Sequence, residues 1–325
     1  MKQLVILSGK GGTGKTSVAA AFAHLAAEGD DPFRAILVDA DVDASNLELV
    51  LSPTVLETHE FMGGGLAVID PEACEGCGSC ADVCRFEAIA YTGTDEKSPI
   101  VDPIACDGCA ACVYQCPTHT IQLEPQVAGQ WFRSEGRYGP LFHAALRPAQ
   151  ENSGKLVTMV KQQARLLALD EDYDLIIVDG PPGIGCPVIS AASGADLALI
   201  VAEPTAAGVH DLERVLGTTE YFGLPALICI NKADLHLEGT TIIQAFCRER
   251  GIKVVGHIPF DTVVTQAMVQ GLPVTAYGDG SVGQALRRVW KQVLTVLAQE
   301  KNGRLIFSTA MARKSELFRG KGDNA

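Results

Sequence analysis

The chain has little positive charge and no long apolar run. Its 325 residues include 26 Lys and Arg against 39 Asp and Glu, which gives a formal charge of −13 at pH 7. A protein this acidic is repelled by a phosphate backbone, so we expect no nucleic-acid partner. No stretch approaches the roughly twenty apolar residues that a membrane-spanning helix needs, so we expect no stable membrane association.

The start of the sequence also leads us to expect no export signal. The first apolar run, Leu4–Leu7, is much shorter than the apolar region of a signal peptide. Eleven cysteines in a chain without such a signal indicate a reducing compartment, and we expect a cytoplasmic protein. The 47% of apolar residues can form a large core, and the 33 glycines are typical of an α/β protein with many tight strand–helix turns.

Eight of the cysteines form two frames with the same spacing, C-x2-C-x2-C-x3-C. Frame 1 is Cys74, Cys77, Cys80 and Cys84, and frame 2 is Cys106, Cys109, Cys112 and Cys116. The frames are an internal repeat, since each follows an Asp-Pro pair and has a glycine two residues after its first cysteine. The alternative roles for these cysteines are zinc binding and disulfide formation. Both are disfavoured, because zinc sites rarely use a third cysteine at this spacing and disulfides need an oxidising compartment.

This spacing resembles that of bacterial ferredoxins that hold two 4Fe–4S clusters. In those proteins the fourth cysteine of each frame ligates the other cluster. The resemblance therefore implies a crossed arrangement, in which frame 1 donates Cys84 to the cluster of frame 2 and receives Cys116 in return. One cluster is then held by Cys74, Cys77, Cys80 and Cys116, and the other by Cys84, Cys106, Cys109 and Cys112. Arg85 stands where many ferredoxins have Pro, which leaves the ligands intact but alters the local charge.

A second motif lies near the start of the chain. The apolar strand Gln3–Ser8 leads into the glycine-rich run Gly9–Thr16, and a helical pattern follows over Ser17–Ala27. Strand, glycine loop and helix in this order are the context of a phosphate-binding P-loop. Backbone N–H groups of the loop and of the helix N-terminus face the phosphates. We expect Lys15 to contact the β/γ-phosphates and the Thr16 hydroxyl to bind Mg2+.

Lys10 gives this P-loop a special form. The run Lys-Gly-Gly-Thr-Gly-Lys-Thr from Lys10 to Thr16 resembles the deviant Walker A motif of the MinD/ParA/Mrp and nitrogenase-iron-protein ATPases. In that group the first lysine reaches across a nucleotide-sandwich dimer to the partner's phosphates. The resemblance therefore implies a catalytic role for Lys10, in a homodimer or in a heterodimer with a related ATPase. The alternative is a solvated lysine beside the loop.

The resemblance continues in two acidic segments. Asp39–Leu47 is similar to switch I of the family, in which Asp41 matches the carboxylate that positions the attacking water and Asp39 helps to hold the magnesium shell. The apolar run Leu175–Asp179 has the Walker B pattern of a buried parallel strand that ends in an acid. The magnesium residues implied by the resemblance are Thr16, Asp39 and Asp179.

Three further loops match the family. Gly180–Gly183 resembles switch II, whose glycine senses the γ-phosphate through its N–H. The loops Asn231–Asp234 and Ile258–Asp261 correspond to those that frame the adenine, although the first also resembles the guanine motif of GTPases. The deviant lysine favours ATP. The nucleotide-binding residues so implied are Gly11, Gly12, Thr13, Gly14, Lys15, Thr16, Ser17, Gly183, Asn231, Pro259 and Asp261.

The remaining cysteines are less informative. Cys186 lies seven residues after Asp179, at the offset of a nitrogenase-iron-protein cysteine that ligates a cluster shared between subunits. A redox or bridging role for Cys186 stays open, but such a cluster needs a second cysteine, so a buried structural cysteine is favoured. Cys229 and Cys247 are interpreted as core residues. The C-terminal Cys-x-x-Cys of Mrp-type carriers is absent, which argues against a simple cluster carrier.

The sequence thus predicts an α/β protein, with a mostly parallel doubly wound P-loop NTPase sheet and an inserted α+β ferredoxin-like domain. We expect residues 1–65 and 126–300 to form the ATPase domain, residues 66–125 the insertion, and residues 301–325 a tail. The implied cofactors are two 4Fe–4S clusters, ATP and Mg2+. The leading hypothesis is a dimeric ATPase coupled to electron transfer to a redox partner protein. The alternatives are an ATP-dependent Fe–S assembly or transfer factor, and a MinD-like positioning or regulatory switch with redox-sensing clusters.

Overall fold

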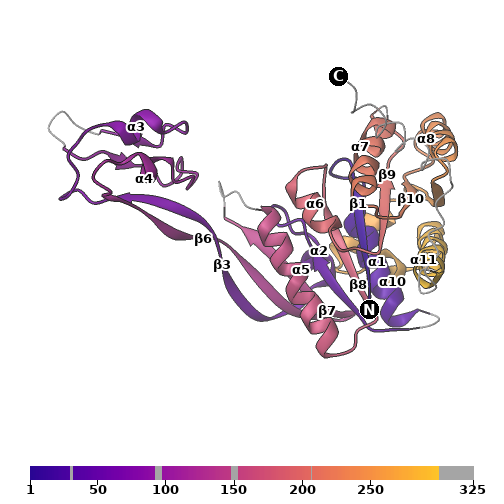
Figure 1. Ribbon diagram of the computed structural model, residues 1–325. Helices are drawn as coiled ribbons and strands as arrows, with labels where there is room; N and C mark the ends of the chain where they lie inside the picture. The colour runs from indigo at the N-terminus through magenta and orange to yellow at the C-terminus, as the bar shows by residue number, and fades with distance from the viewer. Residues whose placement is uncertain (30–31, 92–96, 148–152, 206, 300–325) are drawn as a thin grey trace, which may run out of the picture.

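The computed structural model describes residues 1–29, 32–91, 97–147, 153–205 and 207–299 (Figure 1). The expected tail, residues 301–325, lies outside the described residues. The main feature of the structure is a nine-stranded sheet. The strands are β1 (Lys2–Ser8), β2 (Ala35–Asp39), β3 (Thr54–Ile69), β6 (Ile121–Gly136), β7 (Gly139–Leu146), β8 (Leu175–Pro182), β9 (Leu197–Ala202), β10 (Ala226–Asn231) and β11 (Lys253–Ile258).

Seven neighbouring strands of this sheet are parallel. The order is β11-β10-β9-β1-β8-β2-β7-β6-β3, and every pairing from β11 to β7 is parallel, whereas β6 and β3 continue the sheet in antiparallel pairing. Parallel strands end at the same edge, so β1, β2 and β8 deliver their C-terminal residues side by side. The prediction of an α/β protein with a mostly parallel sheet is confirmed.

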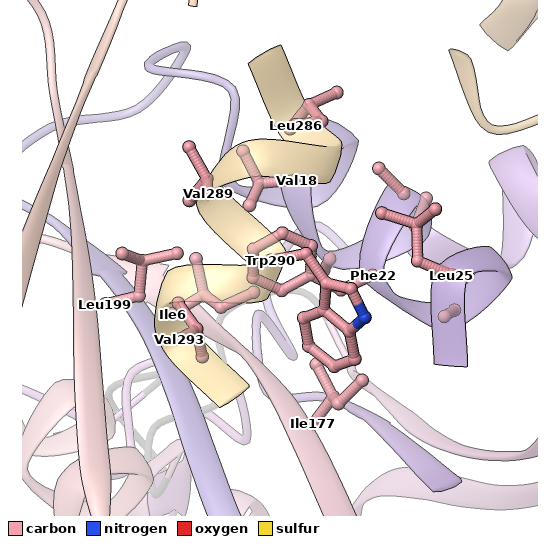
Figure 2. Close-up of a cluster of buried hydrophobic side chains, with 14 of the residues drawn as sticks. Ile6, Val18, Phe22, Leu25, Ile177, Leu199, Leu286, Val289, Trp290 and Val293 are labelled. Atoms are coloured by element: carbon pink, nitrogen blue, oxygen red, sulfur yellow. The ribbon is translucent and has the colours of Figure 1, made fainter. Parts of the chain in front are cut away.

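Helices cover both faces of the parallel sheet, because successive side chains of a strand point to opposite faces. On β1, Leu4 and Ile6 join one apolar cluster, and Val5 and Leu7 join the other. In the first cluster Trp290 packs on Phe22, with their ring centroids 4.6 Å apart (Figure 2). The first cluster includes residues of α1 (Lys15–Glu28), α2 (Leu47–Leu51), α9 (Val263–Val269), α10 (Val274–Tyr277) and α11 (Ser281–Gln299), and the second of α5 (Ser153–Asp170), α6 (Cys186–Ala192), α7 (Gly208–Tyr221) and α8 (Leu237–Glu249).

The strands β3 and β6 form a long antiparallel ribbon. It is paired from Thr54 with Glu135 to Ile69 with Ile121. Beyond its end, residues 70–91 and 97–120 form a separate small unit that projects from the sheet (Figure 1). We call this unit the cysteine lobe and the rest of the sheet with its helices the sheet body. The described part of the lobe contains α3 (Ser79–Val83), β4 (Ile89–Ala90), β5 (Ile100–Val101) and α4 (Ala111–Gln115).

The ribbon was not foreseen as a continuous element. The sequence expectation assigned residues 1–65 to one domain and 66–125 to another, and both proposed boundaries fall inside the ribbon, where Gly65 pairs with Pro125. Thr54–Glu60 are exposed on an edge strand, and Gly63–Gly65 interrupt the side-chain alternation by which strands are recognised. Among the described helices, none is both long and apolar enough to cross a membrane.

Candidate nucleotide site and cysteine pockets

The glycine-rich loop connects the end of β1 to the start of α1. Gly12 and Gly14 have φ angles of 75° and 94°, in the left-handed region that favours glycine. A Cβ at Gly14 would lie 2.4 Å from Nδ2 of Asn231, which donates a hydrogen bond to the Thr13 carbonyl at 2.7 Å. The loop therefore requires glycine at this position both for its turn and for the close approach of Asn231. Gly11, Thr16 and Ser17 occupy the same loop and the first turn of α1.

Lys15 is a buried cation at the start of α1, with 7% of its surface exposed. Its Nζ donates to Oγ of Ser8 at 2.9 Å, and that hydroxyl donates to the Lys10 carbonyl at 2.7 Å. Burial lowers the pKa of Lys15, and the carboxylates of Asp179, Asp41 and Asp39 oppose this shift. Ser8 was not among the expected site residues. Its position as the last residue of the strand before the loop is the signal that could have identified it.

Asp39 is the last residue of β2 and pairs in register with Asp179 of the neighbouring strand β8. Asp39 is completely buried, and it accepts hydrogen bonds from the Ser45 hydroxyl at 2.8 Å and from the Leu47 N–H at 2.9 Å. Oδ1 of Asp179 is buried and has no hydrogen-bond partner in the described part of the protein. Burial, and then the carboxylate of Asp39, raise the pKa of Asp179, while a hydrogen bond with Thr16 opposes the rise. Carboxylate and hydroxyl oxygens collected in this way are suitable ligands for Mg2+.

Asp41 lies beyond Asp39 at the same edge. Its N–H donates to Oδ1 of Asp39 at 3.1 Å. Burial, and then the Asp39 carboxylate, raise the pKa of Asp41 to about 6, while the ammonium of Lys15 lowers it. The structure thus brings together the acidic residues that the sequence placed in two separate segments.

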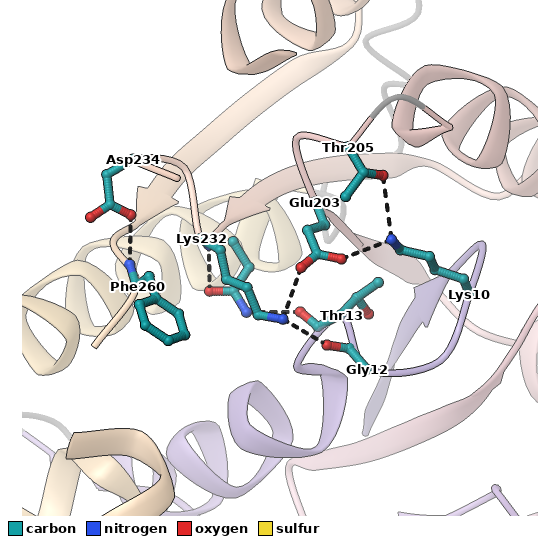
Figure 3. Close-up of polar contacts among 9 residues, drawn as sticks. Lys10, Gly12, Thr13, Glu203, Thr205, Lys232, Asp234 and Phe260 are labelled. Atoms are coloured by element: carbon teal, nitrogen blue, oxygen red, sulfur yellow. Dashed lines mark hydrogen bonds and ion pairs between the residues drawn. The ribbon is translucent and has the colours of Figure 1, made fainter. Parts of the chain in front are cut away.

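Lys10 contacts its own chain through Glu203, which follows β9 (Figure 3). Its Nζ lies 2.9 Å from Oε2 of Glu203 and donates to the Thr205 hydroxyl at 3.3 Å. The other oxygen, Oε1, lies 2.8 Å from Nζ of Lys232, which also donates to the Gly12 carbonyl at 3.1 Å. Burial opposes ionisation of Glu203, but the two lysines outweigh it and lower the pKa of this carboxyl group. Glu203 therefore bridges two lysines beside the P-loop, a role that the sequence analysis missed.

The two loops expected to frame the base are bonded to each other. The N–H of Phe260 donates to Oδ1 of Asp234 at 2.7 Å (Figure 3). Asp261 accepts from the Val263 N–H at 2.9 Å, and Pro259 precedes this turn, directly after β11. Gly183 adopts a φ of 91° after β8, and its N–H donates to the Ser8 carbonyl at 3.0 Å. In this conformation the switch II glycine is therefore bonded to the P-loop strand.

The cysteines of the lobe line two pockets, each with contributions from both frames. One is lined by Cys74, Cys77, Cys80 and Cys116, together with Tyr91 and Thr120 among others. The other is lined by Cys84, Cys106, Cys109 and Cys112, together with Phe86 and Gly108 among others. Each pocket thus combines the first three cysteines of one frame with the last of the other.

No group of three or more His, Cys, Asp or Glu in the described ranges could hold a single metal ion. A cubane cluster has a different requirement, since its four cysteines bind four separate iron atoms. The thiol of Cys116 is distinctive. Burial opposes its ionisation, but hydrogen bonds with Thr120 at 3.5 Å and Thr118 at 3.6 Å outweigh burial and lower its pKa to about 6.

The remaining cysteines differ in exposure. Cys229 and Cys247 are completely buried, which confirms their interpretation as core residues, and burial raises the pKa of Cys229 to about 12. The interpretation of Cys186 as a buried cysteine is wrong, because it is exposed as the first residue of α6. The turn Gly183–Gly185 carries the chain away from β8 and out of the core at this point.

A family model for the CobQ/CobB/MinD/ParA nucleotide-binding domain matches residues 4–274. The chain belongs to this family. It is a P-loop ATPase of the MinD/ParA type. The match spans the P-loop, Asp39, Asp179 and the loops Asn231–Asp234 and Ile258–Asp261. The described geometry is therefore that of the family's nucleotide-binding domain.

Individual relatives agree with this assignment. The chain is 32% identical over 292 residues to an uncharacterised protein of Methanocaldococcus jannaschii, covering 90% of this chain and 96% of the relative. It is 23% identical over 162 residues to the iron–sulfur cluster carrier protein of Pyrococcus furiosus, covering 46% and 54%. The septum site-determining protein MinD with Mg-ADP from Pyrococcus horikoshii has a similar fold, with a TM-score of 0.55 at 19% identity over 90% of this chain and 95% of that one.

Proposed function

We propose that this ATPase holds two 4Fe–4S clusters and couples a nucleotide-dependent dimer to electron transfer to a partner protein. The observation that carries the proposal is the crossed lining of the two pockets in the lobe. Cys116 of frame 2 joins frame 1, and Cys84 of frame 1 joins frame 2. Spacing alone leaves such an exchange open, whereas two-cluster ferredoxins require it.

The lobe offers the chemistry that such clusters need. Cysteine thiolates are the usual ligands of iron–sulfur clusters, and each pocket provides four of them. The bend in each loop depends on a glycine with positive φ, Gly76 at 73° and Gly108 at 68°. Each bound cluster would carry one electron, accepted from a low-potential one-electron donor and passed to an acceptor group of the partner protein.

The sheet body offers the groups that ATP hydrolysis needs. Lys15 would neutralise the β/γ-phosphates, and Thr16, Asp39 and Asp179 would hold Mg2+, for which the unpartnered Oδ1 of Asp179 is available. Asp41 would orient the water whose oxygen attacks the γ-phosphorus. The bond from that phosphorus to the β,γ-bridging oxygen then breaks, which yields ADP and phosphate.

In the proposed dimer Lys10 acts on the partner's phosphates. It is bonded to Glu203 in the chain described here, with its side chain 37% exposed. Release of a partly exposed ion pair costs little, on the order of 1 kcal/mol, so this contact does not prevent the proposed role. The negative phosphates of ATP in the partner copy would supply the opposing attraction when two copies meet.

Metal analysis tests the proposal directly. We expect about eight iron and eight acid-labile sulfide per chain after anaerobic preparation, four of each per cluster. Cys84→Ser should impair the cluster bound by Cys106, Cys109 and Cys112, and Cys116→Ser the cluster bound in frame 1. Zinc in place of iron in natively prepared protein would refute the proposal.

A second candidate function is transfer of clusters to other proteins, favoured by the similarity to the iron–sulfur cluster carrier of Pyrococcus furiosus. A carrier loses iron and sulfide to an apo-acceptor, whereas an electron-transfer protein keeps both and changes only its oxidation state. Incubation of the reduced protein with an apo-ferredoxin, followed by metal analysis of both proteins, distinguishes the two. Retention of the eight irons in the presence of ATP supports electron transfer.

A further inference from the structure

The segment after β2 is bonded directly to the strand that supports the ribbon. This segment contains Asp41, and its Val42 carbonyl accepts a hydrogen bond at 3.1 Å from the N–H of Leu146, the last residue of β7. The next N–H, that of Arg147, donates to the Ala128 carbonyl of β6 at 2.9 Å. The segment after β2 and the part of the ribbon that pairs with β7 are therefore neighbours, although Val42 and Leu146 are 104 positions apart in the chain.

A row of polar side chains makes a second connection, from α2 through β7 to β6. Glu48 of α2 reaches Nδ1 of His143 on β7 through its Oε2, at 3.0 Å. The other ring nitrogen, Nε2, lies 2.9 Å from the hydroxyl of Ser134 on β6. His143 and Ser134 are buried, with 2% and 0% of their surfaces exposed. The ring of Phe132 stacks on that of His143, with centroids 4.9 Å apart.

The bond with Glu48 places a proton on Nδ1 of His143, because a carboxylate only accepts hydrogen bonds. Burial lowers the pKa of His143, which favours the neutral ring, and in that form Nε2 accepts from the hydroxyl of Ser134. Loss of a partner would leave a buried polar group of His143 or Ser134 unpaired, which is costly.

The first link of the row belongs to the nucleotide site. Oδ2 of Asp39 accepts hydrogen bonds from the N–H groups of Asn46 and Leu47, at 3.0 and 2.9 Å, and so holds the start of α2. Glu48 is the next residue of that helix. Asp39 is thus linked through the first turn of α2 to Glu48, and Glu48 is linked through His143 to the strand β6.

We propose that His143 is a positioning residue that transmits the nucleotide state from α2 to the ribbon, and thereby to the cysteine lobe. This inference rests on the proposed function as far as the clusters are concerned. The transmission itself concerns only described contacts of the protein. By reciprocity, the redox state of the lobe changes nucleotide affinity by the same factor as nucleotide changes the redox equilibrium.

The test compares two glutamates that each pair with a histidine. Glu48→Ala interrupts this row of polar contacts at a partly exposed position. His143→Phe interrupts it at its centre while keeping a ring on Phe132. The matched control is Glu57→Ala, since both ion-pair partners given for Glu57 lie on the ribbon, His59 at 3.1 Å and Arg133 of β6 at 3.1 Å. None of these residues belongs to the nucleotide or cysteine sites. Each iron-loaded protein is studied with ADP and with a non-hydrolysable ATP analogue.

Hydrogen exchange of β6 amides is the first readout, and it does not depend on the clusters' redox activity. In the unsubstituted protein and in Glu57→Ala we expect the analogue to change exchange around Ser134. We expect Glu48→Ala and His143→Phe to lose this change while binding the analogue within about threefold of the unsubstituted protein. An unchanged response in both variants, or no response in the unsubstituted protein, overturns the inference.

Nucleotide affinity of oxidised against reduced protein is the second readout. Coupling free energies of such switches correspond to roughly 5- to 150-fold changes. We expect the ratio of nucleotide affinities of the oxidised and reduced protein to lie in this range for the unsubstituted protein and for Glu57→Ala. For Glu48→Ala we expect this ratio to be near one. A ratio of one in every protein, with the exchange response still lost in Glu48→Ala, would support the transmission path and refute the redox part of the proposed function.

Discussion

The sheet body and the cysteine lobe are stabilised in different ways. The body has apolar clusters on both faces of its sheet, in which residues such as Leu4, Phe22 and Ile177 are completely buried. Among the described residues, the buried cluster of the lobe and the adjoining end of the ribbon consists of six: Ala67 and Ile121 of the ribbon, and Cys80, Ile89, Cys112 and Cys116 of the lobe. Three of these six are cysteines of the two frames. The apolar area that the lobe can remove from water is therefore small.

The sheet body and the cysteine lobe also differ in where the proposed site residues lie relative to the apolar core. In the body the nucleotide residues stand at the edge of the sheet, and the core lies below them, so a site residue can be replaced without opening the core. In the lobe Cys80, Cys112 and Cys116 belong to the core and to the pockets at once. Loss of one of these cysteines is therefore also loss of packing, and under the proposed function the free energy of cluster binding would become free energy of folding.

Removal of iron and sulfide is the change with the largest expected effect. We expect the lobe to lose its hydrogen-exchange protection around α3 and α4, because few apolar contacts remain to hold it. The sheet body should keep the protection of β1 and β8. Exchange measured before and after treatment with an iron chelator checks this. A lobe that stays protected without iron would contradict the comparison.

Asp41→Ala is expected to have the next largest effect. Loss of the carboxylate that orients the attacking water should lower the rate of ATP hydrolysis by about 10²- to 10⁴-fold while ATP still binds. Unfolding of the body should remain unchanged, since Asp41 lies outside the core. Asp43→Ala, a change at an exposed neighbouring carboxylate, is the control and should hydrolyse ATP at close to the normal rate.

The two lysines of the P-loop should differ from each other. Lys15→Ala removes a buried cation from the phosphate site, so we expect ATP affinity to fall by roughly 30- to 5,000-fold, from about 2–5 kcal/mol. Lys10→Ala should bind ATP with near-normal affinity but fail to dimerise and turn over. Calorimetry and analytical ultracentrifugation with ATP separate the two defects. Normal dimers of Lys10→Ala would refute the sandwich arrangement.

Glu203→Gln should have a smaller and opposite effect. The substitution removes the carboxylate that holds Lys10 within its own chain, at 2.9 Å. The pair is partly exposed and contributes about 0.5–1 kcal/mol, so dimers should form at about two- to fivefold lower protein concentration with ATP. Sedimentation across a concentration series measures this change. An unchanged or weaker dimer would show that Glu203 does not compete with the partner for Lys10.

Ala110→Gly is expected to have the smallest effect and sharpens the comparison within the lobe. Ala110 has a φ of 61°, and the corresponding residue of frame 1 is Gly78, with a φ of 80°. An alanine is strained in this region, so glycine should stabilise the lobe by about 0.5–1 kcal/mol. The rate of iron loss to a chelator should slow accordingly. The reverse change, Gly78→Ala, should accelerate it.

Much of the site followed from the sequence because its residues lie in short local motifs. The glycine loop, the acid after Leu175–Val178 and the spacing of each cysteine frame are determined by a few neighbouring residues. Strand and helix positions in the body followed for the same reason, since buried parallel strands are continuous apolar runs. The α1 helix, for example, extends over Lys15–Glu28 where the pattern indicated Ser17–Ala27.

Contacts between distant segments were decided only by the tertiary structure. Nothing local to Glu203 shows that it lies beside Lys10, nor does the neighbourhood of Cys186 show that this thiol is exposed. The ribbon β3–β6 depends on pairing between strands whose nearest residues, Ile69 and Ile121, are separated by the whole lobe. The sequence by itself therefore determined which chemical groups are present and how each motif folds. The sheet determined which groups meet, because its parallel strands end at one edge whatever their distance along the chain.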